Sequence, residues 1–209
     1  MERRGSDGKL LRLWASSVTE QAMRAINFTV GLTSGSRESI DRRVIDRMTQ
    51  SAAGRIDEPL LLVRLMVTES SAERALMFTQ GFPYETPPLK RSALGNWNEV
   101  SLALPVGGSA PTTLQSLPKW LAGWKRNHRL ILVDLGPMHQ VPSRTIGRYC
   151  DSCYLVLGPV SCASHAWIMR EIAILDHCGV SLVGTILASD GDLGTSTEAT
   201  TPAPQPIAA

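Results

Sequence analysis

The sequence predicts an α/β fold with a mostly parallel central sheet flanked by helices on both faces. Two observations lead to this fold class. Apolar runs of strand length, such as residues 60–67 and 130–135, carry almost no charge, which is typical of strands covered on both faces. Amphipathic segments separate these runs along the chain, and alternating strands and helices build parallel sheets through crossover connections.

The elements of the first half follow from hydrophobic spacing. Residues 10–25 place apolar side chains three and four positions apart, which predicts a helix, and residues 27–34 are β-branched and apolar, which predicts a strand. A second helix is predicted over residues 38–53 because its apolar positions fall on one face. Residues 60–67 then form a buried strand, and residues 70–80 form a weaker helix.

The middle of the chain is predicted in the same way. Prolines place a surface loop over residues 81–92, and a Gly/Pro turn follows the short strand 100–104. Residues 114–126 form a helix with one buried row of leucine and tryptophan side chains. Residues 130–135 form the second clearly buried strand.

The last elements are a short helix, a strand, a helix and a final strand. They are predicted over residues 144–149, 153–157, 163–177 and 182–187. We expect three parts: a flexible N-terminus over 1–9, a single domain over 10–188, and a disordered Ala/Thr/Pro tail over 189–209.

Composition excludes several classes of protein. The 209 residues carry a formal charge of +2, which removes the electrostatic case for a dedicated nucleic-acid binder. No apolar run approaches the ~18 residues of a membrane span, and the basic N-terminus is not followed by the apolar core of a signal peptide. We therefore expect a cytoplasmic protein without nucleic-acid partners.

The turn after the first strand is a candidate phosphate loop, comprising Gly35, Ser36, Arg37, Glu38 and Ser39. Such a loop needs glycines, so that backbone N–H groups converge on phosphates, together with a lysine and a Mg²⁺-binding Ser or Thr. Gly35 and Ser39 stand at usable positions, but Glu38 occupies the lysine position and Arg37 the second glycine position. Losing the lysine costs roughly 1.5–3 kcal/mol of binding, and a carboxylate adds repulsion.

Asp134 is the second candidate residue of this site. It comes near the end of the buried strand 130–135 and precedes a Leu-Gly-Pro turn. An Asp in this place is the usual group that supports Mg²⁺ in nucleotide hydrolases. Alternatively, Asp134 only accepts a hydrogen bond from the neighbouring turn.

The order of these features resembles the cytoplasmic tyrosine kinases of bacterial capsule and exopolysaccharide synthesis, a branch of the MinD/ParA-like P-loop ATPases. The resemblance runs over residues 10–188. Its pieces are TVGLTSGSRESI for the phosphate loop, EPLLLVRL for the second strand, VSLALPVGG, HRLILVDLGPM, and the closing CDSCYLVLGPVSCASHAWIMREIAILDHCGVSLVGTIL. It implies a P-loop NTPase-like domain.

The resemblance also implies which functional residues are kept. Ser39 stands at the Mg²⁺-ligand position and Asp134 at the third acidic position, whereas Glu38 replaces the lysine and Arg64 stands where the second strand of the family carries an Asp. The tyrosine-rich tail that such kinases phosphorylate is absent, and so is the Glu/Arg/Arg assembly pattern of the first helix. These departures imply a degenerate nucleotide site and a pseudo-enzyme.

The function implied is that of a non-catalytic accessory or regulatory protein of exopolysaccharide synthesis or export, which needs no cofactor. Its partner would be the cytoplasmic segment of a membrane polysaccharide co-polymerase or synthase, or an active homologue, which would bring it to the inner membrane; a homo-oligomer is a further option. One alternative is an ATPase or tyrosine kinase with an unconventional phosphate loop that uses ATP and Mg²⁺. Another is a MinD/ParA-type positioning protein.

Two expectations concern side-chain pairing and surfaces. The charges of Glu38 and Arg64 look exchanged relative to the family, so we expect these residues to form an ion pair in the vacated site; otherwise Arg64 extends to solvent from a strand edge. Trp14, Trp120 and Trp124 would form a partner surface if they are partly exposed.

The cysteines allow a zinc hypothesis. Cys150 and Cys153 have the spacing of half a zinc site, with Cys162, His165, His177 and Cys178 downstream. Because Cys153 begins a predicted buried strand, it is better interpreted as a small apolar core residue, and no metal is expected.

Overall fold

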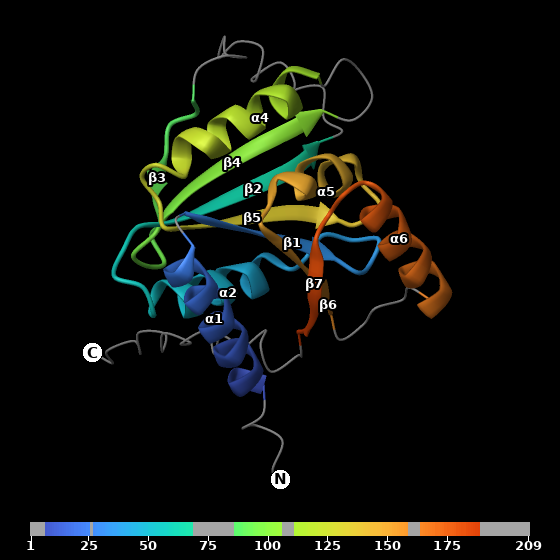
Figure 1. The fold of residues 1–209 in the computed structure, drawn as a ribbon, viewed down its shortest axis with the longest axis horizontal. Helices are drawn as coiled ribbons and strands as arrows, with labels where there is room; N and C mark the ends of the chain where they lie inside the picture. Colours follow the sequence, from blue (N-terminus) through green and yellow to red (C-terminus); the bar gives the residue numbers. More distant parts are fainter. Residues whose placement is uncertain (1–6, 26, 69–85, 106–110, 159–163, 189–209) are drawn as a thin grey trace, which may run out of the picture.

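The computed structural model describes residues 7–25, 27–68, 86–105, 111–158 and 164–188. Its centre is a seven-stranded sheet in the order β3-β4-β2-β5-β1-β6-β7 (Figure 1). Neighbouring strands are parallel, except that β3 pairs antiparallel with β4. The predicted α/β fold with a mostly parallel sheet is therefore confirmed.

The bounds of the elements follow the hydrophobic pattern closely. The strands are β1 (Phe28–Ser34), β2 (Leu60–Thr68), β3 (Lys90–Arg91), β4 (Asn98–Pro105), β5 (Leu130–Pro137), β6 (Ser152–Leu157) and β7 (Leu182–Leu187). The helices are α1 (Asp7–Arg24), α2 (Arg42–Ala53), α4 (Pro111–Trp124), α5 (Val141–Ile146) with the 3-10 turn Gly147–Tyr149, and α6 (His165–His177).

Helices cover both faces of the sheet, and each face has its own core. Even-numbered residues of β2 and β5, such as Leu62 and Leu132, pack against α1 and α2. Odd-numbered residues, such as Val63 and Val133, pack on the other face with α4 and α6. This division follows from the two-residue period of a strand. Figure 1 shows α1 and α2 on the side opposite α4 and α5.

Three differences from the sequence-based expectations concern element bounds. α1 begins at Asp7, within the N-terminus that we expected to be flexible, and α2 begins at Arg42 rather than at residue 38. The two-residue strand β3 lies in the segment that we expected to be a loop. The expected helix over 70–80, most of the loop 81–92, the turn around 106–110 and the tail 189–209 lie outside the described residues.

The part of the chain that the structure describes contains no helix long and apolar enough to cross a membrane.

Candidate nucleotide site

The candidate site lies at the carboxyl ends of three neighbouring strands, β1, β2 and β5. β5 runs between the other two, with Leu32 of β1 and Arg64 of β2 both in register with Asp134. β1 ends two residues after Leu32, and the candidate loop begins at the next residue, Gly35. The sheet therefore brings the predicted loop, Arg64 and Asp134 to one edge, which is where open α/β sheets bind their ligands.

The loop after β1 closes on itself through serine hydroxyls. The backbone N–H of Ser36 donates to Ser34 Oγ at 3.1 Å, and the N–H of Glu38 donates to Ser36 Oγ at 3.2 Å. Ser36 Oγ in turn donates to the carbonyl of Glu38 at 3.0 Å, and the two serine hydroxyls lie 2.9 Å apart. Two N–H groups that a phosphate loop would direct at its ligand are thus already bonded within the loop.

Gly35 is required by packing against β6. Its N–H donates to the carbonyl of Val156 at 2.9 Å, so the pairing of β1 with β6 continues into the loop. A Cβ atom at this position would lie 2.1 Å from Leu157 Cδ2 and 3.2 Å from Leu155 Cδ1. The glycine allows a close approach between two strands, which explains its presence without a phosphate.

The N-terminus of α2 is capped by its own carboxylate. Asp41 precedes the helix, and its Oδ1 accepts a hydrogen bond from the N–H of Arg43 at 2.7 Å. Asp is among the preferred N-cap residues, so the helix begins after Asp41 although the apolar spacing extends further upstream. The N–H groups and dipole that would attract a phosphate therefore face a negative charge of the chain itself.

Arg64 pairs with Asp46 of α2 and not with Glu38, the partner that we expected. The Arg64 side chain is buried, at 6% exposure, and its Nη2 donates to Asp46 Oδ1. Glu38 is exposed and lies outside α2, whereas Asp46 faces β2 from within the helix. Because Arg64 is buried, the alternative in which it extends to solvent is excluded as well.

Asp134 lies beside this ion pair and has a perturbed pKa. Burial raises the pKa of Asp134 to about 6, against the lowering effects of the hydrogen bond from Gly136 and of the charge on Arg64. The N–H of Gly136 donates to Asp134 Oδ1 at 3.2 Å. This contact is the bond to the neighbouring turn that the sequence left open as one role for Asp134.

Two buried hydroxyls that sequence reasoning missed fix the turn after β5. Thr33 donates to the carbonyl of Gly136 at 2.9 Å. Ser143 of α5 contacts Thr33 Oγ1 at 3.0 Å and donates to the carbonyl of Pro137 at 2.9 Å. Gly136 adopts a φ of 73°, a conformation that favours glycine. Hydrophobic spacing in the sequence gives no sign of these two hydroxyl groups. The one available signal is the position of Thr33 near the end of an apolar strand, next to the candidate loop.

These residues do not fit Mg-ATP. The N–H groups of the loop donate to serines, and the helix N-terminus is capped by Asp41. Ser39 is exposed in the coil before α2, where it cannot serve as the first-turn Mg²⁺ ligand of a phosphate loop. The buried cation of the site, Arg64, is neutralised by Asp46, and its Nε has no hydrogen-bond partner among the described residues.

Cys150 and Cys153 pack as core residues. Cys150 and Cys153 are free and buried, and both sulfurs lie close to the position that a Cβ at Gly31 would take. The nearby Cys153 and burial raise the pKa of the Cys150 thiol above its usual range. Within the described ranges, no three His, Cys, Asp or Glu side chains are grouped to hold a metal; Cys162 lies outside them.

The tryptophans expected at a partner surface are buried. Trp120 and Trp124 lie in the core between α4 and the sheet, with ring centroids 6.3 Å apart. Their spacing of four residues places both on the helix face that meets the sheet. Trp14 is also buried, against Tyr154, although it borders a surface groove.

Comparisons with known proteins bear on the fold. No family model and no curated protein matches the sequence. Among solved structures, the BceF tyrosine kinase domain matches with a TM-score of 0.62 and 21% identity, over 85% of this chain and 75% of that one. The kinase domain of the tyrosine kinase ETK from Escherichia coli matches with a TM-score of 0.65 and 15% identity, over 86% and 74%.

A third match is the MinD cell division protein of Aquifex aeolicus, with a TM-score of 0.51 and 15% identity over 77% of this chain and 68% of that one. The fold is that of tyrosine kinase domains and MinD. The P-loop NTPase-like architecture that the resemblance implied is thereby confirmed, and at these identities the likeness concerns the fold alone.

Proposed function

We propose that this chain is a non-catalytic accessory or regulatory protein of bacterial exopolysaccharide synthesis or export, acting by protein–protein binding. The observation that carries the proposal is the closure of the candidate nucleotide site. Its loop N–H groups, its helix N-terminus and its buried arginine are each bonded to a group of the chain itself. A fold shared with tyrosine kinase domains but lacking an available phosphate site supports a pseudo-enzyme.

Closure also argues against the unconventional ATPase. Binding a triphosphate there would require the loop to give up its serine hydrogen bonds and Asp41 to leave the helix N-terminus. Asp134, which lies beside Arg64 and accepts a hydrogen bond from Gly136, would also have to turn from Arg64 towards a metal. Each of these steps opposes binding, and none is offset by a lysine at position 38.

Calorimetry of the full chain with Mg-ATP tests the proposal directly. We expect no measurable heat of binding up to millimolar nucleotide, under conditions in which a nucleotide-competent kinase gives a clear isotherm. A dissociation constant in the micromolar range would instead favour the ATPase or tyrosine kinase alternative. Gel filtration with and without Mg-ATP tests the MinD/ParA-type alternative, which requires nucleotide-dependent dimers.

The polysaccharide role has its own test. The tagged chain is purified from its native host, and the co-purifying proteins are identified by mass spectrometry. We expect the cytoplasmic segment of a membrane polysaccharide co-polymerase or synthase, or an active homologue, to be recovered. Recovery of only unrelated proteins in repeated purifications would contradict this role, while the calorimetric result would still stand.

A further inference from the structure

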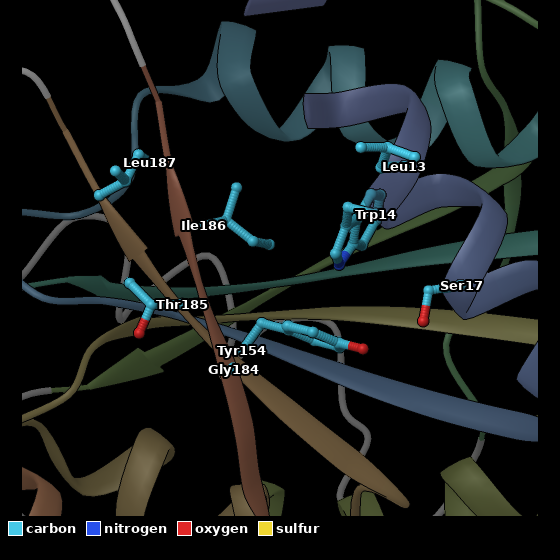
Figure 2. Close-up of a pocket in the computed structure, with 8 residues that line it drawn as sticks. All are labelled: Leu13, Trp14, Ser17, Tyr154, Gly184, Thr185, Ile186 and Leu187. Atoms are coloured by element: carbon cyan, nitrogen blue, oxygen red, sulfur yellow. The ribbon is translucent and has the colours of Figure 1, made fainter. Parts of the chain in front are cut away.

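A groove of about 360 Å³ lies between α1 and the edge strand β7 (Figure 2). It is lined by Leu13, Trp14 and Ser17 of α1, by Tyr154 of β6, and by residues 184–187 of β7. Leu13 and Leu187 are exposed, at 58% and 61%, so the groove is open to solvent. None of its lining residues is charged, which suits an uncharged, largely apolar occupant.

The outer edge of β7 presents backbone groups beside this groove. β7 is the last strand of the sheet, and the N–H of Ala188 donates to the carbonyl of Leu157 in β6 at 2.8 Å. Because backbone groups alternate along a strand, the N–H and C=O of Thr185 and Leu187 point away from β6. Among the described residues no strand pairs with them, and β7 carries neither the charge nor the proline that commonly protects an edge.

Two aromatic rings, those of Trp14 and Tyr154, line the groove. Trp14 is 7% exposed, and its Nε1 has no acceptor among the described residues. The ring meets Tyr154 edge to face, with centroids 6.1 Å apart, and Figure 2 shows the indole nitrogen at the end of the ring nearest Tyr154 and Ser17. Because the indole nitrogen is buried, the two rings offer the groove an apolar surface.

We propose that an extended, uncharged segment of another protein adds to β7 as a further strand and inserts a side chain into the groove. Its backbone pairs with Thr185 and Leu187, and an apolar side chain contacts Leu13 and the ring of Trp14. Strand addition of this kind takes affinity from main-chain hydrogen bonds and specificity from side-chain pockets. The groove shares no residue with the candidate nucleotide site, so this inference does not depend on the polysaccharide role.

The short free edge favours a single segment over a second copy of the chain. The register of β6 with β7 shifts between Cys153 and Tyr154, so regular pairing continues only over the last residues of β7. Two outward-facing residues provide few hydrogen bonds for joining the sheets of two copies. A stable dimer also needs about 800 Å² of buried surface on each partner, which so short an edge does not supply. A single segment can add apolar contacts in the groove to these few hydrogen bonds, and such contacts increase its affinity.

The test selects short peptides from a phage-displayed random library on the immobilised full chain and measures their affinities by fluorescence polarisation. We expect uncharged sequences with alternating apolar residues. Leu13→Glu should weaken their binding about tenfold because it places a charge in the groove. Met23→Glu is the matched control: Met23 is 66% exposed on the same helix but does not line the groove, and the change should leave affinity intact.

A second pair of variants tests the backbone contact. Thr185→Pro removes one outward-facing N–H, which an edge strand tolerates, and should weaken binding by about tenfold. Thr185→Val keeps that N–H and should bind like the parent chain. In spectra of the labelled chain, the indole N–H resonance of Trp14 should shift when peptide is added.

Three outcomes would overturn the proposal. The first is selected peptides that bind Leu13→Glu and Thr185→Pro as tightly as the parent. The second is a dimer that Thr185→Pro dissociates, because the occupant would then be a second copy. The third is peptide binding that appears only after residues 189–209 are deleted, because the occupant would then be a segment of the chain itself.

Discussion

The guanidinium of Arg64 on β2 is neutralised by the carboxylate of Asp46 on α2, the helix that packs over the strand. Arg64 is also in register with Asp134 on β5, so one buried cation lies beside two carboxylates. This cluster is located at the edge of the sheet where a nucleotide would bind. The one cation of this cluster is already paired with a carboxylate of the chain.

Removing the cation should therefore be costly. Arg64→Leu removes the positive charge beside both Asp46 and Asp134. Breaking a buried pair in this way costs about 3–5 kcal/mol of unfolding free energy. Urea denaturation followed by circular dichroism measures the loss. Adding Asp46→Leu to this variant should recover a large part of it, and a single-variant loss below about 1 kcal/mol would show that the pair is not buried in solution.

Arg42 is the natural comparison for that experiment. It also approaches Asp46, at 3.9 Å, but its side chain is 71% exposed. Exposed ion pairs contribute little, so Arg42→Leu should change the unfolding free energy by less than about 0.5 kcal/mol in the same denaturation assay. Equal losses of unfolding free energy in Arg42→Leu and Arg64→Leu would mean that burial does not determine the strength of these ion pairs.

Asp134 should make stability depend on pH. Its folded-state pKa of about 6 is above its usual value of 3.8, so the folded chain holds this proton more tightly than the unfolded chain. Stability from this group is fully present below pH 3.8 and is lost as the pH rises through 6, an effect of about 3 kcal/mol. Asp134→Asn should therefore gain stability relative to the parent between pH 4 and pH 7.5, measured by urea denaturation. Parallel curves for the two proteins would contradict the raised pKa.

Restoring a lysine should not restore nucleotide binding. Glu38→Lys returns the charge that the resemblance implies at this position, but the residue lies outside α2 and the helix N-terminus stays capped by Asp41. We expect calorimetry of Glu38→Lys with Mg-ATP to give no binding up to millimolar nucleotide. A micromolar affinity would show that one charge, and not the closed loop, abolishes binding.

Gly31 should tolerate no larger residue. A Cβ atom there would lie 2.6 Å from Cys153 Sγ and 2.8 Å from Leu135 Cδ1, both buried. Gly31→Ala should cost about 1–3 kcal/mol through overpacking, read as a fall in the midpoint of thermal unfolding. Cys153→Ala in the same chain should restore part of the loss by making room, and failure of this rescue would place the strain elsewhere.

The strands could be predicted from the sequence because burial on both faces leaves a direct signal. The apolar runs over 60–67 and 130–135 recur as the buried strands β2 and β5 with nearly the same bounds, and 182–187 recurs as β7, which is partly exposed. Asp134, expected near the end of its strand, lies three residues before the end of β5. In each case a local pattern decides the outcome, since an apolar run with at most one charge has few alternatives to a strand.

The details of the site could not be predicted because they depend on packing between elements. Apolar spacing continues upstream of Asp41, but the cap, a single hydrogen bond, decides where α2 begins. Charge exchange with the family suggested Glu38 as the partner of Arg64. Arg64 pairs with Asp46 because of the way α2 lies across the sheet. The residue spacing within α2 or within β2 does not indicate this packing.

The strand order has a consequence for synthesis of the chain. β1 pairs with β5 and β6, and β2 also needs β5 on one side, so the middle of the sheet joins the earliest strands to late ones. A nascent polypeptide cannot complete this arrangement until the ribosome has released β5 and β6. Until then β1, with Val30 and Leu32, has no strand partner and β2 is paired with β4 on one side only. Unpaired apolar strands of this kind favour aggregation during synthesis.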